Sequence, residues 1–149
     1  MERILRAQTE QEMQALGAAL ARKLGGGGFV ALYGDLGAGK TELVRGAART
    51  FGVERLTSPT FTIVQEYPTK PTLYHFDAYR VADEDELYAI GYTDYLREDT
   101  LLFMEWANLV KGCLPKERLD VWIEGSGGER RTIRMEAHGT RYETALEQL

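Results

Sequence analysis

Two spacings of apolar residues divide the chain into expected helices and strands. Apolar positions recur every three or four residues over 13–24, behind Thr9 and Glu12, which form the capping pattern of a helix N-terminus. Unbroken apolar runs at 29–33 and 100–104 are typical of strands buried on both faces. The first pattern predicts an amphipathic helix, and the two runs predict the centre of a sheet.

Further strands are expected on either side of these runs. Residues 62–67 and 72–77 are rich in β-branched and aromatic side chains and flank a turn with two prolines, which indicates an antiparallel hairpin. Residues 119–124 and 131–135 flank a glycine-rich turn and predict a second hairpin, half of which is solvated. A short strand is also expected over 2–6.

The remaining helices are predicted mainly from their boundary residues. We expect them over 42–51, 84–90, 94–97 and 140–149. Asp83 is a strong N-cap for the second of these, and Thr140 forms a capping box with Glu143 for the last. Because buried strands and hairpins occur together, we predict one α/β domain over residues 1–149, with a mixed parallel and antiparallel sheet flanked by helices.

Residues 34–41, directly after the first apolar run, read Gly-Asp-Leu-Gly-Ala-Gly-Lys-Thr. Between a strand and a helix, the pattern G-x-x-x-x-G-K-[ST] is typical of a phosphate-binding P-loop. Glycines let backbone N–H groups turn toward an anion, and the helix N-terminus adds partial positive charge. We expect Lys40 to reach the β- and γ-phosphates of a nucleotide and the Thr41 hydroxyl to bind Mg²⁺.

Two acids follow apolar strands at the point where a P-loop protein places its Mg²⁺ and catalytic carboxylates. Asp77 ends the strand over 72–77, and Glu105 follows the run at 100–104. Mg²⁺ prefers hard oxygen ligands, one or two of them from carboxylates. We favour Glu105 as the Mg²⁺ ligand, directly or through water, and Asp77 as its support or as the group that orients water. The sequence leaves these two assignments open.

Four other residues are candidates for sensing the nucleotide or binding a partner. Ser58 and Thr60 flank a proline and could form a switch segment ordered by the γ-phosphate, or an ordinary turn. Arg80 could neutralise phosphate charge or pair with Asp77. Trp106 could cover the nucleotide, dock a partner or belong to the core.

The remaining titratable groups predict no second site. His75 alternates within an apolar strand, so we expect a structural role in the core. Arg130 and Arg131 stand beside a hairpin turn, where arginines are usually solvated. Cys113 is the single cysteine, which excludes an internal disulfide and a cysteine-based zinc site. No cluster of His, Cys and Asp has zinc-ligand spacing.

Composition limits the class of protein. The chain is 44% hydrophobic and 28% charged, which is typical of a soluble globular protein, and its formal net charge is −5. A protein that binds nucleic acid by itself usually has a basic surface, so another subunit would supply most of the contacts with any nucleic acid. The N-terminus lacks the pattern of a signal peptide, and no apolar run approaches a membrane span. We therefore expect a cytoplasmic protein.

Four segments together resemble one family. Residues 34–41, 58–61, 75–80 and 105–106 occur in the order and spacing of the TsaE family, ATPases of bacterial tRNA threonylcarbamoyladenosine biosynthesis. The resemblance implies slow hydrolysis of ATP with Mg²⁺, in support of the TsaB–TsaD heterodimer, which modifies the tRNA. Contact with tRNA would then be indirect, through the complex.

The resemblance also implies roles for individual residues. It places ATP against Thr9, Asp35, Leu36, Gly37, Ala38, Gly39, Lys40, Thr41 and Arg131. It assigns Asp77 and Glu105, with Lys40, to metal binding and catalysis. Ala78 departs from the family pattern, which more often has a larger aliphatic residue there. The change affects packing and leaves these roles intact.

Two other functions remain open at this stage. A small-molecule P-loop kinase is one, although the chain shows no arginine-rich lid and no second substrate pocket. A nucleotide-gated module that binds a partner with little functional turnover is the other. The choice of ATP over GTP rests on the resemblance, with modest support from the absence of an Asn-Lys-x-Asp motif.

Overall fold

A computed structural model describes residues 1–35, 37–59, 61–125 and 128–149. The strands are β1 (Glu2–Ala7), β2 (Gly28–Tyr33), β3 (Val64–Tyr67), β4 (Thr72–Asp77), β5 (Thr100–Glu105), β6 (Arg118–Glu124) and β7 (Arg131–His138). The α-helices are α1 (Glu10–Leu24), α2 (Lys40–Thr50), α3 (Glu84–Ala89) and α4 (Thr140–Glu147). Two 3₁₀ helices, η1 (Tyr92–Tyr95) and η2 (Ala107–Cys113), complete the described elements.

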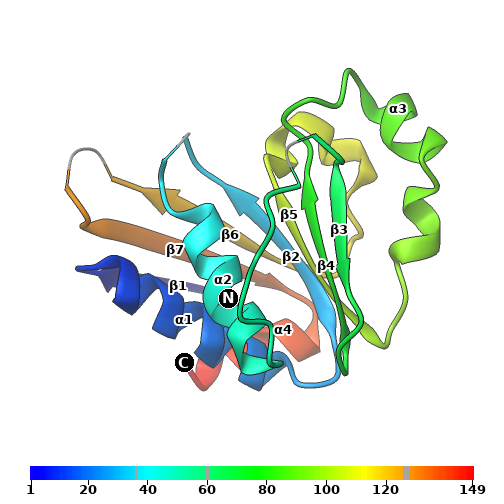
Figure 1. The fold of residues 1–149 in the computed structure, drawn as a ribbon. Coiled ribbons are helices and arrows are strands. Elements are labelled where there is room, and N and C mark those ends of the chain that lie inside the picture. The colour runs from blue at the N-terminus through cyan, green and yellow to red at the C-terminus, as the bar shows by residue number, and fades with distance from the viewer. Residues whose placement is uncertain (36, 60, 126–127) are drawn as a thin grey trace.

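All seven strands form one sheet in the order β1-β7-β6-β2-β5-β4-β3 (Figure 1). The four central strands, β6, β2, β5 and β4, are parallel. Strand β7 pairs antiparallel with β6, β1 pairs antiparallel with β7 at one edge, and β3 pairs antiparallel with β4 at the other. The predicted α/β fold with a mixed sheet is confirmed, and so are both predicted hairpins, β3–β4 and β6–β7.

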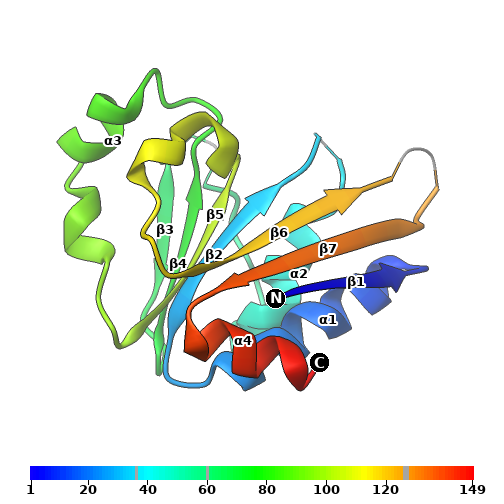
Figure 2. The same cartoon turned by 180° about the vertical axis from the view of Figure 1, so that it is seen from behind.

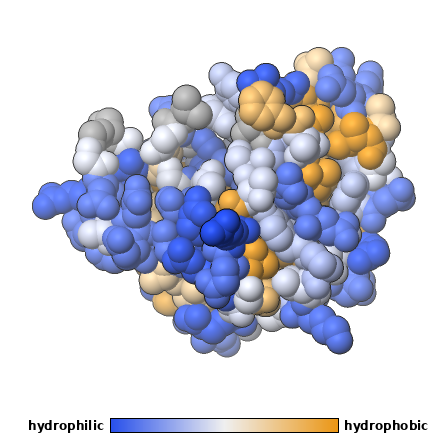
Figure 3. All heavy atoms as spheres, viewed as in Figure 1, coloured by the Kyte–Doolittle hydropathy of each residue, from blue (hydrophilic) through white to orange (hydrophobic). Residues whose placement is uncertain are grey.

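Helices cover the two faces of the sheet unequally. Helices α1, α2 and α4 pack on one face, and α3, η1 and η2 cover β2, β5 and β4 on the other (Figures 1 and 2). The surface over α1 and α2 is mainly polar, whereas apolar side chains gather at the end of the molecule that carries β3 and α3 (Figure 3). Within the described residues, no helix has the length and apolar character needed to cross a bilayer.

Two glycines set how closely α1 and α2 approach each other. A Cβ atom on Gly17 would lie 1.9 Å from the carbonyl oxygen of Leu43, and one on Gly46 would lie 1.8 Å from that of Gln14. Both distances are far inside van der Waals contact, so the helices touch through backbone atoms. Since α2 begins at Lys40, this contact also fixes the position of the loop that precedes it.

The predicted caps were right at two helices and wrong at the third. The Thr9 hydroxyl accepts a hydrogen bond from the Glu12 N–H at 3.1 Å, and the Asp83 carboxylate accepts one from the Glu86 N–H at 2.9 Å. Thr140, however, is the first residue of α4 and not its cap. Gly139 occupies the cap position with φ 108°, so no side chain caps this helix.

Other boundaries also differ from the prediction. The short helix expected at 94–97 is the 3₁₀ helix η1, two residues earlier, and η2 was not predicted. Strand β6 was expected to be half solvated, but Leu119, Asp120 and Val121 are all buried. The reason is that β6 pairs with β2 as well as with β7, and so lies inside the sheet.

Candidate nucleotide-binding site

Three neighbouring parallel strands end at the same edge of the sheet. There β2 leads into the loop before α2, β5 ends at Glu105 and β4 ends at Asp77. Glu105 is paired in register with Leu32 on one side and with Asp77 on the other. Ligands of open α/β sheets bind outside the carboxyl ends of the strands. The topology therefore brings the glycine-rich loop and both predicted acids to the position where a ligand is expected.

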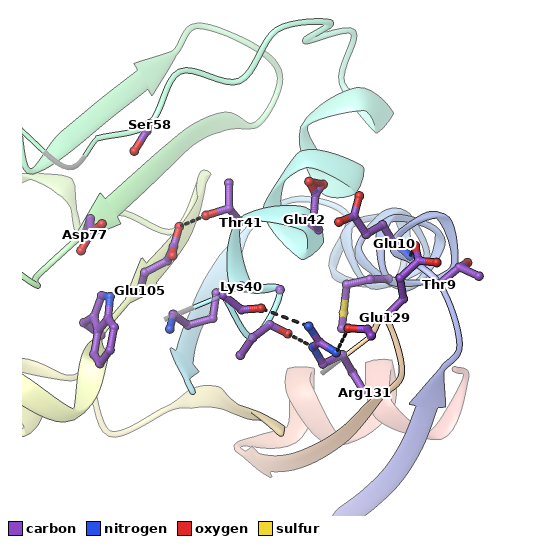
Figure 4. A pocket seen from close by; sticks show the side chains of 16 residues that line it. Thr9, Glu10, Lys40, Thr41, Glu42, Ser58, Asp77, Glu105, Glu129 and Arg131 are labelled. Atoms are coloured by element: carbon purple, nitrogen blue, oxygen red, sulfur yellow. Dashed lines mark hydrogen bonds between the residues drawn. The ribbon is translucent and has the colours of Figure 1, made fainter. Parts of the chain in front are cut away.

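A cavity of about 310 Å³ lies at this edge (Figure 4). The described residues that line it are Thr9, Glu10, Met13, Gly37, Ala38, Gly39, Lys40, Thr41, Glu42, Ser58, Asp77, Glu105, Trp106, Gly128, Glu129 and Arg131. Asp77, Glu105 and Ser58 lie at one end, and Thr9, Glu10, Glu129 and Arg131 lie at the other, with Lys40 and Thr41 between them. The volume is at the lower end of the range for small-molecule sites, about 300–1,000 Å³.

Lys40 is almost completely buried at the first turn of α2. Its ammonium group donates to the carbonyl oxygens of Gly34 and Asp35 and lies 4.0 Å from the centre of the Trp106 ring. Burial lowers the pKa of the Lys40 ammonium, and the nearby carboxylates, Glu105 foremost, oppose that shift. The loop and Trp106 thus hold the lysine head in the cavity.

Glu105 links helix α2 to strand β4. Its Oε2 atom accepts a hydrogen bond from the Thr41 hydroxyl at 3.0 Å (Figure 4). The same oxygen lies 2.5 Å from Nε2 of His75, which is fully buried in β4. Strand alternation explains the arrangement, because His75, Asp77 and Glu105 all point to the face that carries α2.

Asp77 and Trp106 complete this end of the cavity. The Asp77 carboxylate accepts a hydrogen bond from the Tyr79 N–H at 2.9 Å, and burial raises the pKa of this carboxyl group. Trp106 has φ 60°, a left-handed conformation that is uncommon outside glycine, and follows Glu105 directly. This turn directs the ring under Lys40 and against the Tyr79 ring, with the two ring centres 4.9 Å apart.

Arg131 braces the loop at the other end. Its guanidinium group donates to the carbonyl oxygens of Ala38 at 2.8 Å and Gly37 at 3.1 Å. Beside it, the Glu129 carboxylate accepts from the Glu10 N–H at 3.3 Å, at the start of α1. Arg131 was expected either to be solvated, as an arginine beside a turn, or, through the family resemblance, to lie near ATP. It is half-buried against the loop and lines the cavity.

The structure brings together most of the predicted site residues. Lining the cavity are Thr9, Gly37, Ala38, Gly39, Lys40, Thr41, Ser58, Asp77, Glu105, Trp106 and Arg131. Asp35 contributes its carbonyl oxygen to Lys40 but does not line the cavity. Arg80 is also outside it, with its guanidinium 4.5 Å from the centre of the Phe61 ring. Leu36 and Thr60 lie outside the described residues.

Sequence reasoning missed several lining residues. Met13 was assigned only to an apolar stripe, and Glu10, Gly128 and Glu129 carried no signal. The contact of His75 with Glu105 was also missed. The sequence signal for this contact is that His75 lies two residues before Asp77, which places both side chains on the same face of a strand.

The charges around the cavity favour a cation as part of the ligand. The described lining residues carry five carboxylates against two cationic side chains, Lys40 and Arg131. A nucleoside triphosphate alone would meet a net negative site. The Thr41 hydroxyl beside the Glu105 carboxylate offers hard oxygens of the kind that suits Mg²⁺. In the described part of the chain, no three His, Cys, Asp or Glu side chains form a metal-binding group.

Comparisons with known proteins agree on one family. The family model described as "Threonylcarbamoyl adenosine biosynthesis protein TsaE" matches residues 7–133. The tRNA threonylcarbamoyladenosine biosynthesis protein TsaE of Bacillus subtilis is 39% identical over 146 residues, covering 97% of this chain and 91% of that protein. The protein of the same name from Streptomyces coelicolor is 37% identical over 142 residues, covering 89% of this chain and 95% of that protein. The crystal structure of Bacillus subtilis YdiB matches with a TM-score of 0.79 at 34% identity, covering 99% of this chain and 93% of YdiB.

Proposed function

Since the chain belongs to the TsaE family of threonylcarbamoyl adenosine biosynthesis proteins, we propose that it is an ATPase of tRNA threonylcarbamoyladenosine biosynthesis. ATP would bind with Mg²⁺ in the cavity above residues 34–41, and its hydrolysis would support the TsaB–TsaD complex. The observation that carries the proposal is the meeting of the phosphate-binding loop, Asp77 and Glu105 at one cavity.

The loop and Lys40 would hold the phosphates. Backbone N–H groups at the start of α2 carry partial positive charge and favour an anion there. Lys40 is bound to the carbonyl oxygens of its own loop, so its charge is already directed into the cavity. Arg131 supports the other side of the loop through hydrogen bonds to the carbonyl oxygens of Gly37 and Ala38. In this proposal Lys40 binds the β- and γ-phosphates, and Arg131 holds the loop in its conformation.

Thr41 and Glu105 would hold the metal ion, Glu105 directly or through water. When bound, Mg²⁺ would neutralise charge that develops on the transferred phosphoryl group. The Thr41 hydroxyl can offer its oxygen lone pairs to a cation while its O–H group still donates a hydrogen bond to Glu105, which matches the bond between them. Asp77, one strand further along, is then left to orient the attacking water. Its raised pKa suits a group that accepts a proton.

Coupling to a partner would involve the rim of the cavity. Ser58 and Trp106 line it, and the neighbouring Phe61 and Tyr79 are 82% and 55% exposed. Large exposed aromatic side chains beside a site are typical of interaction surfaces. The TsaB–TsaD heterodimer is the partner that the family resemblance implies, and it would also hold the tRNA. The predicted cytoplasmic location fits this role.

Nucleotide binding tests the first half of the proposal. Wild type and Lys40→Ala are titrated with ATP in the presence of MgCl₂ and again in EDTA, by calorimetry. We expect tight binding only for wild type with Mg²⁺, because Lys40 supplies phosphate contacts and the metal offsets the five carboxylates. Equal affinity in Lys40→Ala would overturn the assignment of the loop.

The fate of the γ-phosphate tests the second half. Wild type is incubated with ATP labelled at the γ-position, with and without the TsaB–TsaD complex. We expect slow release of inorganic phosphate that rises with the complex. Label that appears instead on a small-molecule acceptor would favour a kinase.

A further inference from the structure

His75 stands out among the buried residues beside the site. It has no exposed surface and lies in the middle of β4, on the face covered by α2. Its nearest polar neighbour is Oε2 of Glu105, 2.5 Å from Nε2. This is also the oxygen that accepts from the Thr41 hydroxyl. A single carboxylate oxygen is therefore fixed between a donor from α2 and a ring nitrogen from β4.

The second ring nitrogen settles which atom carries the proton. Within the described ranges, Nδ1 of His75 is buried without a hydrogen-bond partner. A buried N–H with no acceptor costs more free energy than a buried lone pair in the same place, so the unpartnered nitrogen is the one without hydrogen. Nε2 then carries the ring proton and donates it to Glu105.

Packing alone does not require a nitrogen at this position. Leu73 on the same face of β4 and Phe103, which is paired with His75 on β5, are both apolar. A buried polar ring is disfavoured relative to an apolar one unless a hydrogen bond compensates it. Among the described residues, the bond to Glu105 is the compensation that the structure provides.

We propose that His75 is a positioning residue: its Nε2–H group holds the Glu105 carboxylate so that Glu105 and Thr41 are arranged in advance for Mg²⁺. This inference rests on the function proposed above and adds a residue to it. Groups that hydrogen-bond to metal ligands orient them, and loss of such a partner typically lowers metal affinity about 10- to 100-fold.

Three variants separate positioning from packing. His75→Phe keeps a ring of similar size without nitrogens, and His75→Gln keeps an N–H donor. Phe103→Leu is the matched control, because it disturbs the paired core position but removes no hydrogen bond. Each variant is titrated with MgCl₂ at fixed ATP while bound nucleotide is followed. A second titration with ATP in EDTA measures the metal-free affinity, and circular dichroism checks folding.

We expect His75→Phe to raise the Mg²⁺ concentration at half-maximal nucleotide binding about 10-fold or more. The metal-free ATP affinity should stay unchanged, His75→Gln should recover most of the loss, and Phe103→Leu should keep the wild-type midpoint. Equal midpoints in wild type and His75→Phe would overturn the proposal, and so would equal shifts in all three variants. A wild type that binds no ATP would contradict the proposed function of the cavity instead.

Nitrogen-15 NMR of the histidine rings tests the bond without nucleotide or metal. The chain has two histidines, so a His138→Gln variant assigns the signals of His75. We expect the ring proton on Nε2 at neutral pH, and a change of the Nε2 signal in Glu105→Gln, since the amide is a weaker acceptor. A proton on Nδ1 would contradict the proposed hydrogen bond. This result would not depend on whether the protein binds nucleotide.

Discussion

Glu105 shows how a single side chain joins the fold to the site. It ends a fully buried strand, receives a hydrogen bond from Thr41 and lies against His75. Its position at a strand end could be predicted from the sequence, because the acid directly follows an unbroken apolar run. The partner His75 could not, since that contact depends on the register of β4 against β5, which no local pattern specifies.

Trp106 should report nucleotide binding by its fluorescence. The Lys40 ammonium lies 4.0 Å from the centre of its ring, and phosphates would draw that ammonium away. We expect MgATP to change the emission of wild type and of Trp122→Phe, and to leave that of Trp106→Phe unchanged. A signal that persists in Trp106→Phe would place the nucleotide away from this ring.

Cys113 should react slowly in the folded protein. Burial raises the pKa of its thiol, so the reactive thiolate is scarcer at neutral pH than in a free cysteine. Alkylation by iodoacetamide is expected to need a higher pH than alkylation of glutathione, and to become fast in urea. The pH–rate profile checks this, and a profile matching that of glutathione would contradict it.

At the scale of elements, the helix pair α1–α2 positions the loop that precedes α2, the proposed phosphate-binding loop. Local patterns predicted both helices and the loop, because capping and apolar spacing are contained in short segments. They gave no hint that Gly46 is where α2 touches the backbone of Gln14, since helix contacts are made between distant segments. The misassigned cap at Thr140 is a similar case, because Gly139 with φ 108° takes the cap position.

Gly46→Ala is expected to destabilise the protein by about 1–3 kcal/mol, the typical cost of overpacking. The added Cβ atom would lie 1.8 Å from a backbone oxygen of α1, and the higher helix propensity of alanine, about 0.8–1.0 kcal/mol, is too small to compensate. Gly26→Ala is the control, because its Cβ atom would meet nothing within 4 Å. Urea unfolding measures both, and equal stabilities would refute the close approach.

The molecule as a whole presents a site at one sheet edge and a surface that is acidic overall. The fold class followed from the sequence because two kinds of strand pattern were both visible. The strand order did not, and neither did the burial of β6 between β2 and β7, since these depend on long-range pairing. The formal net charge of −5 bears on the partner as well.

The isolated chain is expected to bind tRNA weakly, if at all, at physiological ionic strength. Nucleic-acid binding relies on neutralisation of phosphates by a basic surface, and this chain carries an excess of acids. Gel retardation of tRNA with the chain alone, and with the TsaB–TsaD complex as a positive control, measures this. Tight retardation by the chain alone would show that it contributes its own tRNA-binding surface.

Reconstituted tRNA modification tests the central claim most directly. Modified adenosine formed per TsaB–TsaD complex is counted over many turnovers, with no added chain, with wild type, and with Lys40→Ala or Glu105→Ala. We predict sustained turnover when the complex is supplied with wild type, and not with either variant, because each variant would lack part of the proposed ATP cycle. Full turnover with Glu105→Ala, despite lost ATP hydrolysis, would contradict the account and show that the cavity serves as a nucleotide-gated binding site.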